Sequence, residues 1–128
     1  MDSVIKSEME ANGYDVDGAI HRFSGNEVLY LTFLKRFPSN EHYDKIEKNL
    51  IDKNLIDKNY ETAYKAAHAL KGITGNLGLN PVYRLLEEML STMRNKESVV
   101  DFEEKLEGLY KQFQAEYEKS IKLIAKLG

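Results

Sequence analysis

The sequence predicts an all-α protein, an antiparallel up-down-up-down four-helix bundle with short additional N-terminal helices. Its 128 residues contain only two prolines and eight glycines, fewer turn-forming residues than all-β chains usually carry. Apolar residues recur every three or four positions over long stretches, which is the period of an amphipathic helix. No segment alternates apolar and polar residues over a useful length, so we expect no sheet.

The size and composition are those of one folded domain. The chain is 42% apolar and 30% charged, which provides enough apolar material for a packed core. We expect a single domain over residues 1–128, with its core at about 15–125. Residues 1–14 are expected to form an N-terminal helix or a linker from a preceding domain.

Two short helices are expected first. Residues 3–11 form an amphipathic pattern that ends at Asn12-Gly13. Asp17 is a good N-cap for a second helix, which Ser24-Gly25 would end, because glycine readily leaves the helical conformation.

A long, mostly apolar helix is predicted to begin near Asn26 and to break or kink at Pro38. A helical pattern resumes over residues 40–57. It contains the direct repeat LIDKN at 50–54 and 55–59, whose period of five fits neither helix nor strand. We interpret this repeat as a local duplication at a helix end or loop, because solenoid repeats are much longer.

Three further helices complete the prediction. The first spans about 59–78. The second follows Asn80-Pro81, where asparagine is a good N-cap and proline suits the first helical position. The last spans about 98–127 and carries Glu and Lys opposite its apolar face. Short connections between long amphipathic helices favour antiparallel neighbours, and hence a bundle.

The composition disfavours several classes of function. A net charge of -3 disfavours a nucleic-acid partner, which needs a basic surface. The absence of cysteine excludes disulfides, thiol nucleophiles and cysteine-ligated metal sites. No apolar run is long enough for a signal peptide or a membrane span, so we expect a cytoplasmic protein without membrane contact.

Residues 63–80 contain the most informative pattern, because it places a histidine on the solvent side of a helix. Each helical residue turns by about 100°. The apolar stripe of this segment therefore lies opposite His68, which points away from the core. The stripe consists of Ala63, Ala66, Leu70, Ile73 and Leu77.

Three glycines lie on or beside the face of His68. Gly72 and Gly75 share its angular position, and Gly78 flanks it on the same side as Lys71. A glycine inside a helix costs about 1 kcal/mol relative to alanine, so we expect these glycines to let a second surface approach the imidazole. Lys71 lies one turn after the histidine and could hold a dianionic group on the ring. An exposed imidazole is largely neutral at pH 7, and the predicted chemistry is phosphoryl acceptance.

The segment AAHALKGITGNLGL, residues 66–79, resembles the signature of histidine-containing phosphotransfer (HPt) domains. That signature is a His followed by Leu-Lys-Gly or a near variant, a few small residues and a further Gly. The stretch DVDGAIHRFSGNEVLYLTFLKRFPS, residues 15–39, is similar to the family's opening. Asn59-Tyr60-Glu61 resembles the pattern that opens the histidine helix, so the resemblance covers about residues 15–125.

The resemblance implies a phosphorelay mechanism. His68 would accept a phosphoryl group, through Nε2, from an aspartyl phosphate on a receiver domain and pass it to another receiver. Lys71 would stabilise the phosphoryl charge, and Gly72, Gly75 and Gly78 would permit receiver docking. The implied partners are response-regulator receivers, with a hybrid histidine kinase as a further candidate. We expect a monomer without a cofactor of its own, because the chain lacks a GxxxxGK[ST] phosphate loop and the Mg²⁺ needed belongs to the receiver.

Leu90 departs from the family's pattern. Many members place Gln or another polar side chain there, and that side chain hydrogen-bonds the second imidazole nitrogen. The nearest carboxylates, Glu87 and Glu88, are about a turn away. Which group orients the His68 ring therefore stays open at this point.

The remaining candidates have simpler interpretations. His21 and His42 lack the surrounding pattern and are expected to be surface residues. No set of His, Asp and Glu has convincing ligand spacing, so we predict no metal site. Tyr30, Phe33 and Phe37 are expected mostly in the core, with a receiver-docking patch beside the histidine as the alternative.

Two other functions stay open. An HPt-like domain phosphorylated directly by a chemotaxis-type histidine kinase would use the same residues with a different donor. A helical interaction module without chemistry would keep its function and partner affinity after His68→Gln. A catalytic enzyme in its own right is disfavoured, because no motifs converge on a pocket.

Overall fold

A computed structural model describes residues 1–50 and 59–128, and these residues are helical, with no strand among them. The all-α prediction is therefore confirmed at that level. Most of the LIDKN repeat lies outside the described residues. The helices in chain order are α1 (Ser3–Ala11), α2 (Val16–Arg22), α3 (Glu27–Arg36), α4 (His42–Leu50), α5 (Tyr60–Asn76), α6 (Asn80–Arg94) and α7 (Phe102–Ala125), with 3₁₀ turns at Phe37–Ser39 and Lys96–Ser98.

Side-chain caps explain where several helices begin. The Asn26 side chain accepts from the amide of Leu29 at the start of α3, which begins near Asn26 as the sequence predicted. The cap of α2 is Asp15, not Asp17, because the Asp15 carboxylate accepts from the amide of Gly18. Asp17 instead lies in the first turn of α2, where an acidic side chain favours the positive end of the helix.

The start of α6 also differs from the prediction. Leu79 occupies the N-cap position and offers no side-chain hydrogen bond. Asn80 is the first helical residue, and Pro81 follows it within the first turn, where the missing amide hydrogen is tolerated.

Pro38 separates α3 from α4, as expected. The 3₁₀ turn Phe37–Ser39 follows α3 directly, and Asn40 then caps the next helix. The Asn40 Oδ1 accepts from the amides of His42 and Tyr43 at 2.9 and 3.1 Å. The chain therefore ends one helix and begins another within a few residues.

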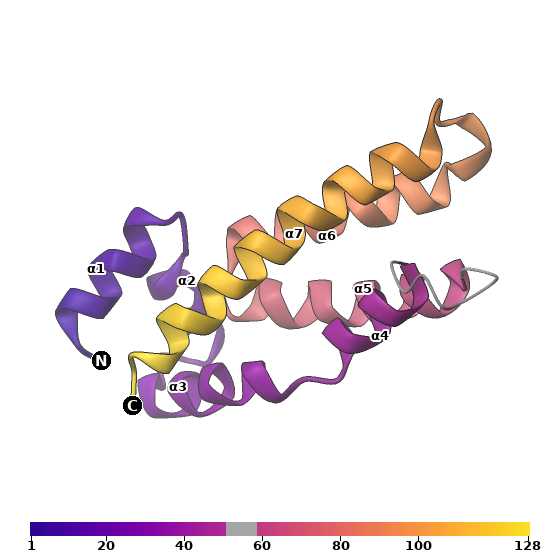
Figure 1. The fold of residues 1–128 in the computed structure, drawn as a ribbon. Helices are drawn as coiled ribbons and strands as arrows, with labels where there is room; N and C mark the ends of the chain where they lie inside the picture. Colours follow the sequence, from indigo (N-terminus) through magenta and orange to yellow (C-terminus); the bar gives the residue numbers. More distant parts are fainter. Residues whose placement is uncertain (51–58) are drawn as a thin grey trace.

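Neighbours in sequence are neighbours in space for the long helices. α4 packs on α5, α5 on α6 and α6 on α7, while α3 contacts α7 (Figure 1). The short helices α1 and α2 lie at the end of the molecule that also holds the C-terminus (Figure 1). An ion pair between Lys126 and Glu8, at 2.8 Å, ties that terminus to α1. None of the described helices combines the length and the apolar character that crossing a membrane requires.

The apolar faces of these helices enclose one core. Tyr30 lies at 0% exposure inside it, and burial raises the pKa of its phenol to about 12. Its hydroxyl donates to the carbonyl oxygen of Leu77 at 3.4 Å. Other fully buried side chains are Met9, Leu34, Ile46, Leu70, Leu79, Leu86, Met89 and Phe113.

Candidate functional site

His68 lies in the middle of α5 and is exposed to solvent. The Asn59 side chain caps the helix by accepting from the amide of Thr62 at 3.1 Å. The opposite stripe is buried, as its periodicity predicted, apart from the half-buried Ile73. Burial of that stripe orients the histidine outward, because residues half a turn apart cannot both face the core. Its buried members are Ala63, Ala66, Leu70 and Leu77.

The helices α5 and α6 run antiparallel, and three contacts define their register. From one contact to the next, the residue on α5 lies further along the chain and the residue on α6 lies earlier by the same number of positions. The contacts are the Tyr64 hydroxyl with an Arg94 guanidinium nitrogen at 3.3 Å, the Lys71 ammonium with a Glu87 carboxylate oxygen at 3.9 Å, and Gly75 with the ring of Tyr83.

The same register brings His68 level with Leu90. His68 is four residues after Tyr64, and Leu90 is four residues before Arg94. Leu90 is 1% exposed and belongs to the core. Among the described residues, no side chain forms a hydrogen bond with the His68 imidazole, so α6 supplies no polar partner for the ring at this level.

Lys71 is half-buried against α6. Its ammonium lies 3.9 Å from a carboxylate oxygen of Glu87 and 5.5 Å from the ring centroid of Tyr83. Glu87 therefore competes with a phosphoryl group on His68 for this ammonium. A pair of this length with an exposed carboxylate is worth at most about 1 kcal/mol, so the carboxylate is a weak competitor.

The three glycines have three different environments. Gly72 is exposed, and a Cβ built there would meet no other atom within 4 Å. A Cβ on Gly75 would lie 3.2 Å from the Tyr83 ring, so this glycine lets the tyrosine pack closely. Arg22 donates to the Gly75 carbonyl oxygen at 2.8 Å, which covers the end of the helix. Of these three glycines, only Gly72 has no neighbouring atom that would prevent a larger residue at its position.

Gly78 lies beyond the end of α5 and is buried. The predicted helix over 59–78 therefore runs two residues too far, and Gly78 is not on the exposed face of His68. Its φ of +71° is left-handed, and the Leu79 amide donates back to Thr74 while the Gly78 amide donates to Gly75. This is a Schellman cap, which needs a glycine at this position. Because Gly78 is buried, it cannot contact a docking partner directly.

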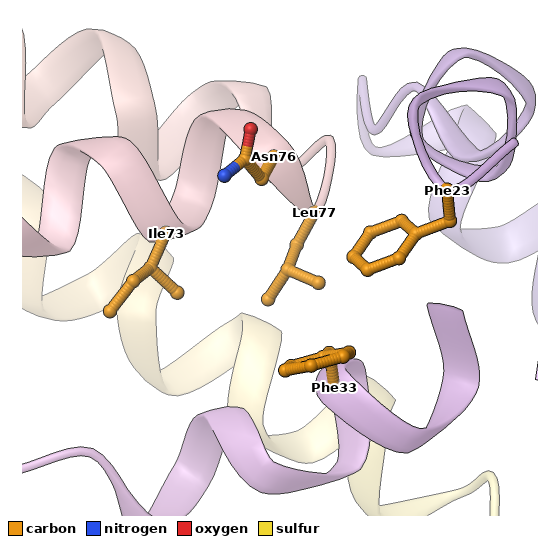
Figure 2. Close-up of a pocket in the computed structure, with 5 residues that line it drawn as sticks. All are labelled: Phe23, Phe33, Ile73, Asn76 and Leu77. Atoms are coloured by element: carbon orange, nitrogen blue, oxygen red, sulfur yellow. The ribbon is translucent and has the colours of Figure 1, made fainter. Parts of the chain in front are cut away.

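An apolar concavity of about 370 Å³ opens beside the C-terminal half of α5. Ile73 and Leu77 project from α5 toward the rings of Phe23 and Phe33 (Figure 2). Phe33 is 43% exposed, so it forms part of the surface. The other two aromatic candidates, Tyr30 and Phe37, are buried in the core.

An exposed strip of α5 connects the histidine to this concavity. Gly72 follows His68 by one helical turn, and Asn76 follows Gly72 by another. All three are exposed, and Asn76 lines the concavity. The imidazole, a bare patch of backbone and an apolar hollow therefore lie in sequence along one side of the helix.

The remaining histidines lie elsewhere. His21 is exposed on α2. His42 is half-buried where α4 meets α5, beside Thr62 and Ala66, so it is not the plain surface residue that was expected. Within residues 1–50 and 59–128, no three His, Asp or Glu side chains are grouped to hold a metal ion.

Sequence reasoning missed one neighbour of the histidine, Tyr64, and the residue that holds it, Arg94. Tyr64 lies one turn before His68 on nearly the same face, so helical spacing could have identified it. Arg94 approaches from α6, and its proximity depends on the register between two helices, which periodicity does not give.

No family model, curated protein or solved structure matches this chain.

Proposed function

We propose that this chain is a histidine phosphotransfer domain of a multistep two-component pathway. One observation carries the proposal: His68 and Gly72 are exposed one turn apart on α5, and a Cβ added to Gly72 would meet no atom within 4 Å, so packing does not require a glycine there. A glycine in mid-helix lowers stability by about 1 kcal/mol relative to alanine, so its presence beside an exposed nucleophile favours a docking role.

The proposed reaction moves one phosphoryl group at a time. The lone pair of His68 Nε2 attacks the phosphorus of a receiver's aspartyl phosphate and forms an N–P bond. The O–P bond breaks, the aspartate carboxylate leaves with the electron pair, and the Nδ1 proton passes to water. In the reverse step another receiver's aspartate attacks the phosphorus, the N–P bond breaks, and the ring takes a proton back from water, which regenerates the neutral imidazole. The Lys71 ammonium stabilises the charge of the bound phosphoryl group.

A receiver has a continuous surface on which to dock. The strip from His68 through Gly72 and Asn76 leads to the concavity that Phe33 helps to line. We place the receiver's active aspartate over His68 and its apolar rim against Phe33. Gly75 and Gly78 support this surface from inside, since one admits Tyr83 and the other ends the helix.

The proposed architecture is the up-down-up-down four-helix bundle. In this arrangement α3 and α4 together form the first arm, broken at Pro38, and α5, α6 and α7 form the other three. The sequential packing of α4 to α7 and the contact of α3 with α7 support a closed bundle. We further propose a monomeric, cytoplasmic protein whose partners are response-regulator receivers, which contribute the Mg²⁺, and a hybrid histidine kinase.

Phosphotransfer onto wild type and His68→Gln tests the proposal. Each protein is incubated with a phosphorylated receiver and Mg²⁺, and its intact mass and the acid lability of the adduct are followed. We expect one acid-labile phosphoryl group on the wild type and none on a folded His68→Gln. Labelling only by an ATP-charged kinase would assign the donor to a chemotaxis-type kinase. No adduct from receivers, kinase or phosphoramidate would contradict the proposal and favour an interaction module without chemistry.

A further inference from the structure

The His68 imidazole lacks the polar restraint that an acceptor histidine needs from the neighbouring helix. Leu90 lies level with it on α6 and is buried, so that position presents no donor or acceptor. An exposed histidine without a restraint samples several rotamers, and only some of them direct the reacting nitrogen toward a donor. A restraint on the ring would therefore raise the fraction of reactive orientations.

Tyr64 is the side chain that meets the imidazole. Its ring lies at 2° to the plane of His68, with 6.5 Å between the ring centroids. A parallel, offset arrangement at this separation is one of the favoured geometries for two rings. Tyr64 is half-buried, so it is itself held, whereas the histidine is exposed.

The phenol of Tyr64 is anchored from the opposite helix. A guanidinium nitrogen of Arg94 donates to its hydroxyl at 3.3 Å. Arg94 is exposed, and its contact links the Tyr64 ring to the end of α6. The Tyr64 side chain is therefore fixed at both ends: its backbone belongs to α5, and its hydroxyl is hydrogen-bonded to Arg94 of α6.

We propose that Tyr64 is a positioning residue, held by Arg94, that restricts the His68 imidazole to reactive orientations in place of a polar partner from α6. This inference rests on the proposed phosphoryl acceptance. Tyr64, whose ring is parallel to the imidazole, precedes His68 by about one turn toward the start of α5, and Gly72 follows His68 by about one turn. The side toward Gly72 stays open for the phosphoryl donor, which is the direction of the docking surface.

The test uses phosphoramidate as the donor, because this small molecule needs no receiver docking. The lone pair of the imidazole nitrogen forms the N–P bond, the donor's P–N bond breaks with loss of ammonia, and the other ring nitrogen releases its proton to water. The variants are Tyr64→Leu, which removes the ring, and Tyr64→Phe, which keeps the ring and loses the bond to Arg94. Tyr60→Leu is the matched control, since Tyr60 is a half-buried tyrosine of the same helix that packs on Phe102.

Two quantities are measured on each protein. NMR relaxation and side-chain couplings of labelled histidine report how restricted the His68 ring is, whether or not any phosphoryl group is transferred. The phosphoramidate reaction gives the maximal rate and the donor concentration at half that rate. We expect Tyr64→Leu to release the ring and to lower the maximal rate by about 2- to 10-fold, with little change in the half-saturating concentration.

The matched variants define what supports and what overturns the inference. Tyr64→Phe keeps the ring but loses the bond from Arg94, so its ring restriction and rate are expected to fall between those of wild type and Tyr64→Leu. Values equal to wild type would overturn the role of Arg94. Tyr60→Leu is expected to leave both quantities unchanged while it lowers stability. Equal ring motion and rate in wild type and Tyr64→Leu would overturn the positioning role and leave the phosphotransfer proposal standing. The wild type could instead show a His68 ring that is restricted only when Tyr64 is present, yet accept no phosphoryl group. That result would support the restraint and contradict the phosphotransfer proposal.

Discussion

Gly78 lies directly against the backbone of Asp15. The Asp15 amide donates to the Gly78 carbonyl oxygen at 2.9 Å, and a Cβ on Gly78 would overlap the carbonyl oxygen of Asp15. The same residue ends α5 at a φ of +71°. One glycine therefore both closes the histidine helix and joins it to the start of α2.

Gly78→Ala is expected to lower the free energy of unfolding by about 3 kcal/mol or more. The left-handed backbone and the overlap with Asp15 both contribute to this loss. Gly25→Ala is the matched control, because Gly25 has a φ of +76° but no atom within 4 Å of an added Cβ. Its loss should be about 1 kcal/mol. Equal losses in urea unfolding would mean that the contact with Asp15 adds nothing.

Gly72→Ala is expected to stabilise the protein and to impair its function. The added methyl group meets no atom within 4 Å, so the gain in helix stability is about 1 kcal/mol. Gly108→Ala should give the same gain, since Gly108 is also an exposed glycine of a long helix with open space around it. Phosphorylation by a receiver should slow about tenfold in Gly72→Ala and stay unchanged in Gly108→Ala.

The small donor separates docking from chemistry in these variants. Phosphoramidate should label Gly72→Ala as fast as wild type, because the methyl group obstructs a protein surface and not a small molecule. Loss of rate with both donors would show that Gly72 acts on the imidazole itself.

Lys71→Ala is expected to slow phosphoryl acceptance by about tenfold with either donor. Lys71 follows His68 by about one turn of α5, and a charged hydrogen bond to the phosphoryl group is worth about 1.5 to 3 kcal/mol. Lys65→Ala is the control on the same helix, since Lys65 is exposed and paired with Glu61 at 3.3 Å. A rate loss as large in Lys65→Ala would point to general surface charge instead of a specific contact.

Alkaline pH is expected to destabilise the fold partly through Tyr30. Burial raises the pKa of Tyr30 from 10.0 to about 12 in the folded protein, so the folded state disfavours the phenolate. This contribution to stability is complete below pH 10 and is lost as the pH rises from 10 toward 12. It amounts to about 3 kcal/mol, and urea unfolding between pH 7 and about pH 11 should reveal part of it. Tyr30→Phe should flatten the curve above pH 10, and an unchanged curve would assign the loss to other groups.

Helical periodicity was sufficient for the local features of this protein. The apolar stripe of α5 identified its buried face and the outward direction of His68, because a helix converts spacing into direction. The break at Pro38 could be predicted because proline has no backbone N–H and cannot donate the next helical hydrogen bond. The prediction over 59–78 ran past the true end at Asn76, because periodicity continues through a glycine that in fact leaves the helix.

The roles of the glycines could not be read from spacing. Gly75 admits Tyr83 from α6, and Gly78 admits the backbone of Asp15, so both depend on segments remote in sequence. The exposed glycine Gly72 is recognised only after the other two are explained by their neighbours.

The sequence by itself determined the helical class, the position of His68 on the solvent side of its helix and the place of Lys71 one turn away, because these follow from local period and residue type. Only the tertiary structure decided which glycine has open space around it and that Lys71 lies against Glu87. It also decided that Arg94 holds Tyr64, whose ring lies parallel to the imidazole. The physical reason is that these relationships depend on the register and packing of α5 against α6 and the α1–α2 connection. Contacts between segments distant in the chain set that register, and the local spacing of residues carries no information about it.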